Sequence, residues 1–171
     1  MGLEQMPIWV ERIGHPASTP WQLFVSGDVL IILRRTLAAA LPDEGCAQLL
    51  GRRRRDGWSL QQVWPCCNVW RPGLAALPEG PWPTHASMPQ PSRRTRFALD
   101  PREQIHAQRW ARSRGLAVIG TAHSHLDGPA VPSATDRHWS HQPGLMVILA
   151  ADQTVRAWWM EPATVSVQHT D

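Results

Sequence analysis

The strongest constraint on the fold is a helix signal that leads directly into a buried strand. The segment Asp100-Pro101-Arg102-Glu103 supplies an N-cap, a proline at the first helical position and an acidic residue in the first turn. We expect this helix to run to about Arg114, with Gly115 as its left-handed C-terminal cap. The apolar run 116–122 follows at once and is typical of a buried strand. This succession predicts an α/β or α+β fold.

The same kinds of signal predict the other elements. Leucines at helical spacing indicate a first helix over 29–41, which Pro42 ends. Asp56-Gly57 lies in the turn of a hairpin between two apolar runs, and Ser133 begins a short helix that extends to Ser140. We expect strands at 46–51, 58–64, 68–70, 96–99, 145–150, 155–160 and 164–168.

These elements predict a mixed β-sheet flanked by two main helices, with a short third helix, in an α+β-like sandwich. Residues 1–22 are expected to form an N-terminal arm, because His15-Pro16 and Thr19-Pro20 interrupt any earlier element. Residues 23–171 then form one domain. The proline-rich segment 71–96 lacks periodicity and is expected to be a long loop inserted into that domain.

Composition excludes several classes of protein. The longest apolar run, Val29–Leu33, is far shorter than the roughly 20 residues of a membrane span, and we expect no contact with a membrane. Three cysteines without a CxxC pair argue against a disulfide framework and a zinc ribbon. The net charge of +3 and the basic cluster Arg52–Arg55 suit a solvated turn better than a nucleic-acid site. A cytoplasmic protein that binds no nucleic acid is expected.

One group of residues has the chemistry of a metal centre. His123 and His125 end the strand at 116–122, and residues two apart in an extended chain project to the same side. Seven residues separate His125 from Ser133, and two residues separate Ser133 from Asp136. Two imidazole nitrogens and one carboxylate oxygen leave a fourth tetrahedral position open, as in a catalytic zinc site. A histidine pair alone is common by chance, whereas the four-residue pattern is not.

Hydrolysis at such a site also needs a proton acceptor that is not a metal ligand. The candidate is Glu44, just after the first predicted helix. Taken by itself, a glutamate at the end of a helix would be expected to lie exposed on the surface.

Together these residues resemble the JAMM/MPN (JAB-type) zinc metalloproteases, whose signature is an upstream Glu followed by HxH, seven to ten residues, Ser, two residues and Asp. The stretch Pro42–Gly51 is similar to the family segment P-x-E-x-C-G-x-L-x-G. Asn68 stands where a family Asn often follows the second strand, and Phe97–Pro101 is similar to the family's strand-to-helix junction. The resemblance covers about residues 23–165 and suits a stand-alone prokaryotic member. Three departures leave the ligands intact: Ala47-Gln48, Ala122 and Leu126.

The resemblance implies a zinc-dependent peptidase or isopeptidase with one Zn²⁺ per chain. In this family pattern His123, His125 and Asp136 hold the zinc, Glu44 is the general base and Ser133 stabilises the oxyanion. The implied substrate is the C-terminal Gly-Gly tail of a ubiquitin-like or sulfur-carrier protein, bound as an added strand at a sheet edge. The bond cleaved joins that tail either to cysteine or another small amine, or to a protein lysine.

Two other functions remain open on the sequence alone. Some MPN domains lack the ligands and serve as non-catalytic scaffolds, and the presence of all five motif residues argues against this alternative. Relatives from phage tails suggest a cell-wall peptidase, against which the lack of a signal peptide and of an accessory domain counts.

Overall fold

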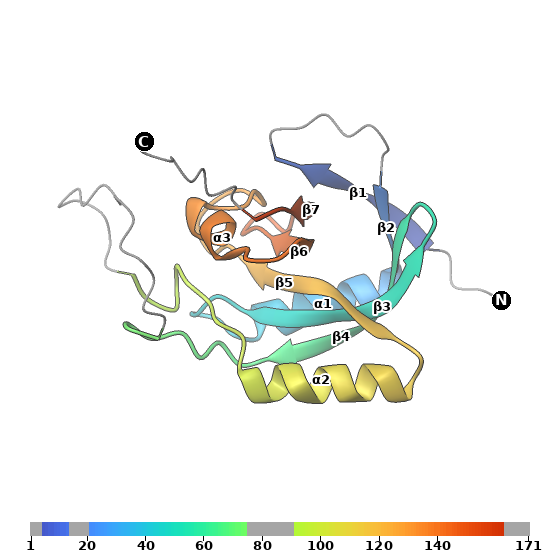
Figure 1. Cartoon of the computed structure of the whole chain (residues 1–171). Helices are drawn as coiled ribbons and strands as arrows, with labels where there is room; N and C mark the ends of the chain where they lie inside the picture. The colour runs from blue at the N-terminus through green and yellow to red at the C-terminus, as the bar shows by residue number, and fades with distance from the viewer. Residues whose placement is uncertain (1–4, 14–20, 75–90, 163–171) are drawn as a thin grey trace, which may run out of the picture.

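The computed structural model describes residues 5–13, 21–74 and 91–162 (Figure 1). Seven strands and three helices make up this part of the chain. In chain order they are β1 (Gln5–Arg12), β2 (Trp21–Ser26), α1 (Gly27–Ala38), β3 (Cys46–Arg54), β4 (Gly57–Cys66), α2 (Pro101–Ser113), β5 (Ala117–Ser124), α3 (Ala134–Trp139), β6 (Gly144–Leu149) and β7 (Val155–Met160).

The sheet is a closed barrel with strand order β1-β2-β4-β3-β5-β6-β7. It is mixed, because the β2–β4, β5–β6 and β1–β7 pairs are parallel and the others antiparallel. The closing contact is the parallel pairing of Val10–Arg12 with Ala157–Trp159. The mixed sheet agrees with the prediction, but the sandwich arrangement does not.

The sheet closes into a barrel because part of the segment 1–22, predicted to be an arm, forms the strand β1. The prolines that suggested an irregular segment before Trp21 lie at 16 and 20, beyond the end of β1. Residues 5–12 are therefore free to pair with β2 on one side and with β7 on the other. That double pairing joins the two ends of the sheet and converts an open layer into a barrel.

The two main helices pack on opposite faces of the sheet, as Figure 1 shows for α1 and α2. Leu33 and Leu37 of α1 belong to the main core, which includes Leu49 of β3. The next residue, Leu50, faces the other way and packs against Ala107 and Ala111 of α2. Alternation along β3 thus gives each face its own helix.

The predicted ends of α2 are confirmed, whereas α1 spans Gly27–Ala38 instead of the predicted 29–41. Ser26 caps α1, with its Oγ accepting a hydrogen bond from the Val29 amide, and Asp100 caps α2. Gly115 has φ of 65° just past α2, the left-handed conformation expected of a helix-ending glycine. The hairpin β3–β4 also occurs where it was predicted, and the two predicted strands that form β6 and β7 pair antiparallel with each other.

Two predicted short strands are absent as strands. The backbone pairing between residues 68–70 and 96–99 amounts to one isolated bridge, between Asn68 and Leu99. Side-chain hydrogen bonds from Asn68, described below, take the place of a regular ladder there. The predicted strand 164–168 and residues 75–90 of the proline-rich loop lie outside the described residues. Within the described chain, no helix has the length and apolarity to cross a membrane.

Gly45 occupies the point where the chain leaving α1 comes closest to that helix. A Cβ at this position would lie 2.1 Å from the carbonyl oxygen of Leu37, and Leu37 is itself fully buried. Only glycine permits this approach, because the obstructing atom is backbone and cannot move aside.

We predict that Gly45→Ala lowers the free energy of unfolding by about 2–4 kcal/mol, as expected for a steric conflict in a packed core. Gly27→Ala is the matched control, because nothing lies within 4 Å of its Cβ position and alanine favours a helix. Urea unfolding followed by circular dichroism measures both variants. Equal stability of the two variants would contradict the role of Gly45.

Candidate metal centre

The antiparallel register of β3 and β5 brings the start of one strand to the end of the other. Cys46, the first residue of β3, is paired with His123 near the end of β5. The pairing continues one step further: Gly45 donates its amide to the Ser124 Oγ at 2.8 Å and accepts from the Ser124 amide at 3.0 Å. Glu44, which precedes Gly45, therefore lies next to the two histidines.

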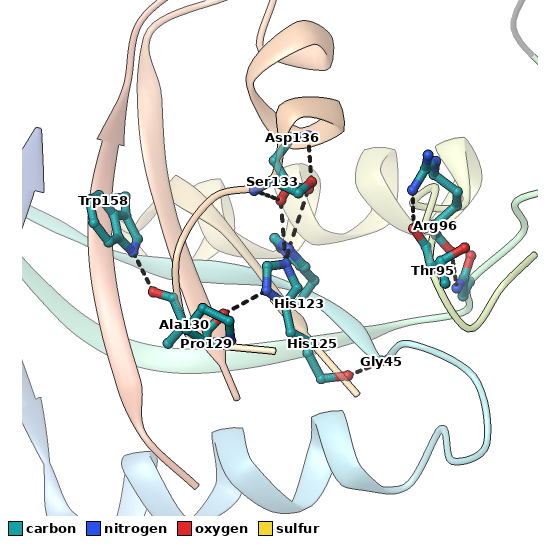
Figure 2. Close-up of polar contacts among 12 residues, drawn as sticks. Gly45, Thr95, Arg96, His123, His125, Pro129, Ala130, Ser133, Asp136 and Trp158 are labelled. Carbon is teal, nitrogen blue, oxygen red and sulfur yellow. Dashed lines mark hydrogen bonds and ion pairs between the residues drawn. The ribbon is translucent and has the colours of Figure 1, made fainter. Parts of the chain in front are cut away.

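The loop after β5 is folded back so that Asp136 meets both histidines. The His125 amide donates to the Leu149 carbonyl at 2.8 Å, and the Trp158 indole donates to the Ala130 carbonyl at 2.9 Å (Figure 2). At its end, Ser133 caps α3 in a capping box with Asp136. The Ser133 amide donates to Asp136 Oδ2 at 2.7 Å, which fixes the direction of the carboxylate.

Three side chains converge on one point, as Figure 2 shows. His123 Nε2 lies 3.0 Å from His125 Nε2 and 3.4 Å from Asp136 Oδ1. His125 Nε2 lies 3.4 Å from Asp136 Oδ2. One ligand atom from each residue lies within 4.8 Å of the others, and this is the single such group of three in the described part of the chain.

The chemistry of this donor set fits a cation. Nδ1 of His125 lies 2.9 Å from the Pro129 carbonyl oxygen, which only accepts, so Nδ1 carries the proton and a neutral ring has a bare Nε2. The Nε2 lone pair of His125 faces the Nε2 of His123 and the carboxylate of Asp136, both at hydrogen-bonding distance. A metal ion satisfies all three, and a backbone carbonyl behind one histidine is the usual orienting partner of a metal ligand. The fold therefore brings together the three side chains that the sequence predicted as metal ligands.

Electrostatics favour the protonation state that a metal needs at two of the three ligands, His123 and Asp136, but not at His125. Complete burial lowers the pKa of His123, which keeps that ring neutral. Burial acts to raise the pKa of Asp136, but hydrogen bonds to both histidines outweigh it and hold the pKa well below its usual range. Burial also acts to lower the pKa of His125, and contacts with Asp136 and the Pro129 carbonyl raise it on balance in the metal-free protein.

Glu44 is buried, contrary to the expectation for a glutamate at a helix end. Its exposed fraction is 7%, and this burial raises its pKa to about 8, with opposing effects from His125 and Arg96 and a reinforcing one from Asp136. Asn68 holds the backbone here, since its Nδ2 donates to the Glu44 carbonyl at 3.0 Å. A carboxyl group that takes up and releases a proton near neutral pH is suited to general acid–base chemistry.

A cavity of about 790 Å³ opens beside these groups. Glu44, His125, Ser133 and Asp136 all line it, whereas His123 is sealed beneath. Four of the five predicted site residues therefore face a space large enough for part of a peptide.

Sequence reasoning did not foresee the positioning roles of three residues. The ring of Phe97 stacks on His123, with centroids 4.3 Å apart and planes 20° from parallel. Ser124, between the histidines, makes the double link to Gly45, and Asn68 joins three separate backbone carbonyls. The resemblance singled out Asn68 and Phe97, but their contacts are long-range and carry no local sequence signal.

The raised pKa of Glu44 has a consequence for stability. The folded-state pKa of about 8 exceeds the ordinary value of 4.5, so between these two pH values the folded protein binds more protons than the unfolded chain. The folded protein therefore loses stability as the pH rises from 4.5 to about 8. In the metal-free protein, we predict that Glu44→Gln is more stable than wild type at pH 9 by more than about 1 kcal/mol, with the difference vanishing near pH 5. Urea unfolding with a chelator at both pH values measures this. The exposed Asp127→Asn is the control, and a Glu44→Gln effect equal at both pH values would contradict the assignment.

Comparison with known proteins places this geometry in a family. A family model described as prokaryotic homologs of the JAB domain matches residues 27–161. No curated protein matches the chain. A solution structure of a protein from Desulfitobacterium hafniense is 23% identical with a TM-score of 0.58, over 86% of this chain and 98% of that one.

Two further solved structures are similar. A protein from Salinibacter ruber is 29% identical with a TM-score of 0.52, over 81% of this chain and 82% of that one. A JAB1/MPN domain protein from Archaeoglobus fulgidus is 19% identical with a TM-score of 0.42, over 85% and 97% of the two chains. Since the family model covers well over half of the 171 residues, the chain belongs to the prokaryotic JAB (JAB/MPN) domain family.

Proposed function

We propose that this protein is a zinc-dependent peptidase that hydrolyses the bond after the C-terminal Gly-Gly of a ubiquitin-like or sulfur-carrier protein. The observation that carries the proposal is the convergence of His123, His125 and Asp136 beside a buried glutamate in an open cavity. The JAB family, to which the chain belongs, includes zinc hydrolases.

His123, His125 and Asp136 would hold the zinc, each through the atom that points to the common centre. When bound, zinc would supply Lewis acidity, which lowers the pKa of a water molecule and polarises a carbonyl. The protein fixes the ligands beforehand through the Pro129 carbonyl, the Ser133 amide and the Phe97 ring. Such outer contacts set ligand orientation and basicity.

Glu44 would move the proton. Its carboxylate accepts a proton from the attacking water and returns it to the leaving amine as the C–N bond breaks. The hydroxyl group remains on the acyl carbon, so the products are the carrier's Gly-Gly carboxylate and a free amine. Burial and the surrounding charges already adjust the pKa of Glu44 toward the neutral range.

Ser133 would stabilise the developing negative charge on the carbonyl oxygen. Its Oγ lines the cavity and accepts from the Asp136 amide at 3.1 Å, and its hydroxyl would turn from the Asp136 carboxylate to donate to that oxygen. Removing a donor of this kind typically costs about 2.7–4 kcal/mol in the transition state.

The substrate tail would lie against segment 96–99, which follows the turn at 93–95 and lines the cavity. The sequence-based expectation placed the tail at a sheet edge. A closed barrel has no edge strand, so addition to the sheet itself is not favoured.

A non-catalytic scaffold remains the second candidate for a JAB domain. The converging ligand set argues against it, since a scaffold would have no need for three metal-ligating side chains at a cavity. Metal content and turnover separate the two functions.

We predict about one zinc per chain in purified protein and its loss in Asp136→Ala, because this change removes one of three ligands. Asp127→Ala is the matched control: the side chain lines the same cavity, is exposed, and is outside the ligand group. Elemental analysis by mass spectrometry, with circular dichroism to show folding, measures both. A folded wild type that takes up no added zinc would overturn the proposal.

Glu44→Gln should retain zinc and lose turnover by about 10²–10⁴-fold, the usual contribution of a general acid–base group. The amide preserves size and hydrogen bonding but cannot take up the proton. Hydrolysis of a carrier protein extended beyond Gly-Gly, followed by mass spectrometry, measures the rate. Wild-type turnover in this variant would remove Glu44 from the mechanism.

A further inference from the structure

We propose that the protein forms a two-fold symmetric dimer in which the outer face of α1 packs antiparallel against α1 of a second copy. The contact buries Ile31 and Ile32 of both chains around the two-fold axis. On either side of them, Asp28 of each chain pairs with Arg35 of the other. This surface lies apart from the metal centre, and the inference does not depend on the proposed function.

The outer face of α1 is an uncovered stripe along the helix. Leu33 and Leu37 point into the core, so α1 covers one face of the sheet with its inner side (Figure 1). The exposed residues recur at the spacing of a single helix face. They are Asp28, Ile31, Ile32, Arg35, Ala38 and Ala39. None of them lines the cavity at the metal centre, so a partner on this face leaves the cavity open.

Two large apolar side chains lie in the middle of this stripe. Ile31 and Ile32 are 48% and 47% exposed. In the part of the chain that the structure describes, they are the one pair of exposed large apolar residues that are adjacent in sequence. Removal of their side chains from water is the main driving force that this face can supply for association.

Asp28 and Arg35 flank the two isoleucines and have no ion-pair partner of their own. Neither side chain forms an ion pair within residues 5–13, 21–74 and 91–162. Seven positions separate them, which is two helical turns and about 10.5 Å along the axis. The midpoint between these opposite charges falls between Ile31 and Ile32.

This pattern is complementary to itself under a two-fold axis through that midpoint. In an antiparallel pair, the axis brings Asp28 of each chain opposite Arg35 of the other, so one isologous contact contains two ion pairs. A parallel pair would instead set aspartate against aspartate and arginine against arginine. The charges therefore select the antiparallel arrangement. A uniformly acidic or basic partner would match one of the two charges, whereas a second copy matches both.

The ends of the stripe allow the two helices to come close together. Ala38 and Ala39 carry only a methyl group, and nothing lies within 4 Å of the Cβ position at Gly27. Packed helices have axes about 8–10 Å apart, and small residues at the ends of a contact permit this distance. The isoleucines can thus meet at the centre without obstruction from the rest of their own stripe.

Sedimentation equilibrium of the full chain tests the dimer, with circular dichroism to show that each variant folds. The wild type should reach twice the mass of one chain, with a dissociation constant on the order of 10 μM for a contact limited to one helix. Ile32→Glu should raise this constant by at least about tenfold, because the introduced carboxylate is buried without a partner. Ile105→Glu is the matched control: Ile105 is 50% exposed on α2, and its change should leave the constant unaltered.

Charge reversal tests the pairing itself. Asp28→Arg and Arg35→Asp should each weaken the dimer by about tenfold, because each change sets like charges opposite one another. An equimolar mixture of the two variants should associate as tightly as the wild type, since opposite charges then face each other at both positions. The mixture needs only one change per chain, which limits any loss of helix stability.

Three results would overturn the inference. The first is a wild type that stays monomeric at a chain concentration of about 1 mM, where even a weak association is detected. The face would then belong to a different partner or to solvent. The second is a dimer that Ile32→Glu does not weaken, since its contact would lie elsewhere. The third is a mixture of charge variants that does not recover the wild-type affinity, which rejects the antiparallel pairing.

Discussion

The site depends on a short link between Gly45 and Ser124, made by one backbone hydrogen bond and one to the Ser124 Oγ. Two hydrogen bonds there extend the β3–β5 ladder past the last regular pair and join the segment that carries Glu44 to the segment that carries both histidines. Without this link, the two segments meet only as the ends of separate elements. The absence of a side chain at Gly45 lets α1 approach at the same point, so the helix and the link support each other.

Much of the site could be predicted because its metal-binding half lies in one continuous segment. The spacing from His123 to Asp136 encodes a strand end, a loop and a capped helix, and each of these has a local signal. The helix caps at Ser26 and Asp100 were predictable for the same reason. Closure of the barrel was not, because the pairing of β1 with β7 joins residues nearly 150 positions apart and leaves no local pattern. The burial of Glu44 was likewise not predictable, because it depends on residues that are distant in the sequence and not on those next to it in the chain.

The two halves of the site serve different chemical needs and are built differently. The ligands come from one segment, with their orientation fixed by the Pro129 carbonyl and the Ser133 amide. Glu44, the proposed general base, lies just before the neighbouring strand β3 and is held by its backbone, through Asn68 and the Gly45 link. Its carboxylate makes no hydrogen bond to the other described residues, which would suit a group that exchanges a proton.

Asn68 extends this arrangement to the cavity wall. Its amide nitrogen joins the carbonyls of Glu44, Arg93 and Arg96, and its Oδ1 accepts from the amides of Trp70 and Ala98. These bonds take the place of the strand ladder that the sequence suggested for 68–70 and 96–99. A ladder would have paired those backbone groups along their length and held segment 96–99 within the sheet. A single side chain satisfies several of them instead, and this keeps segment 96–99 at the border of the cavity.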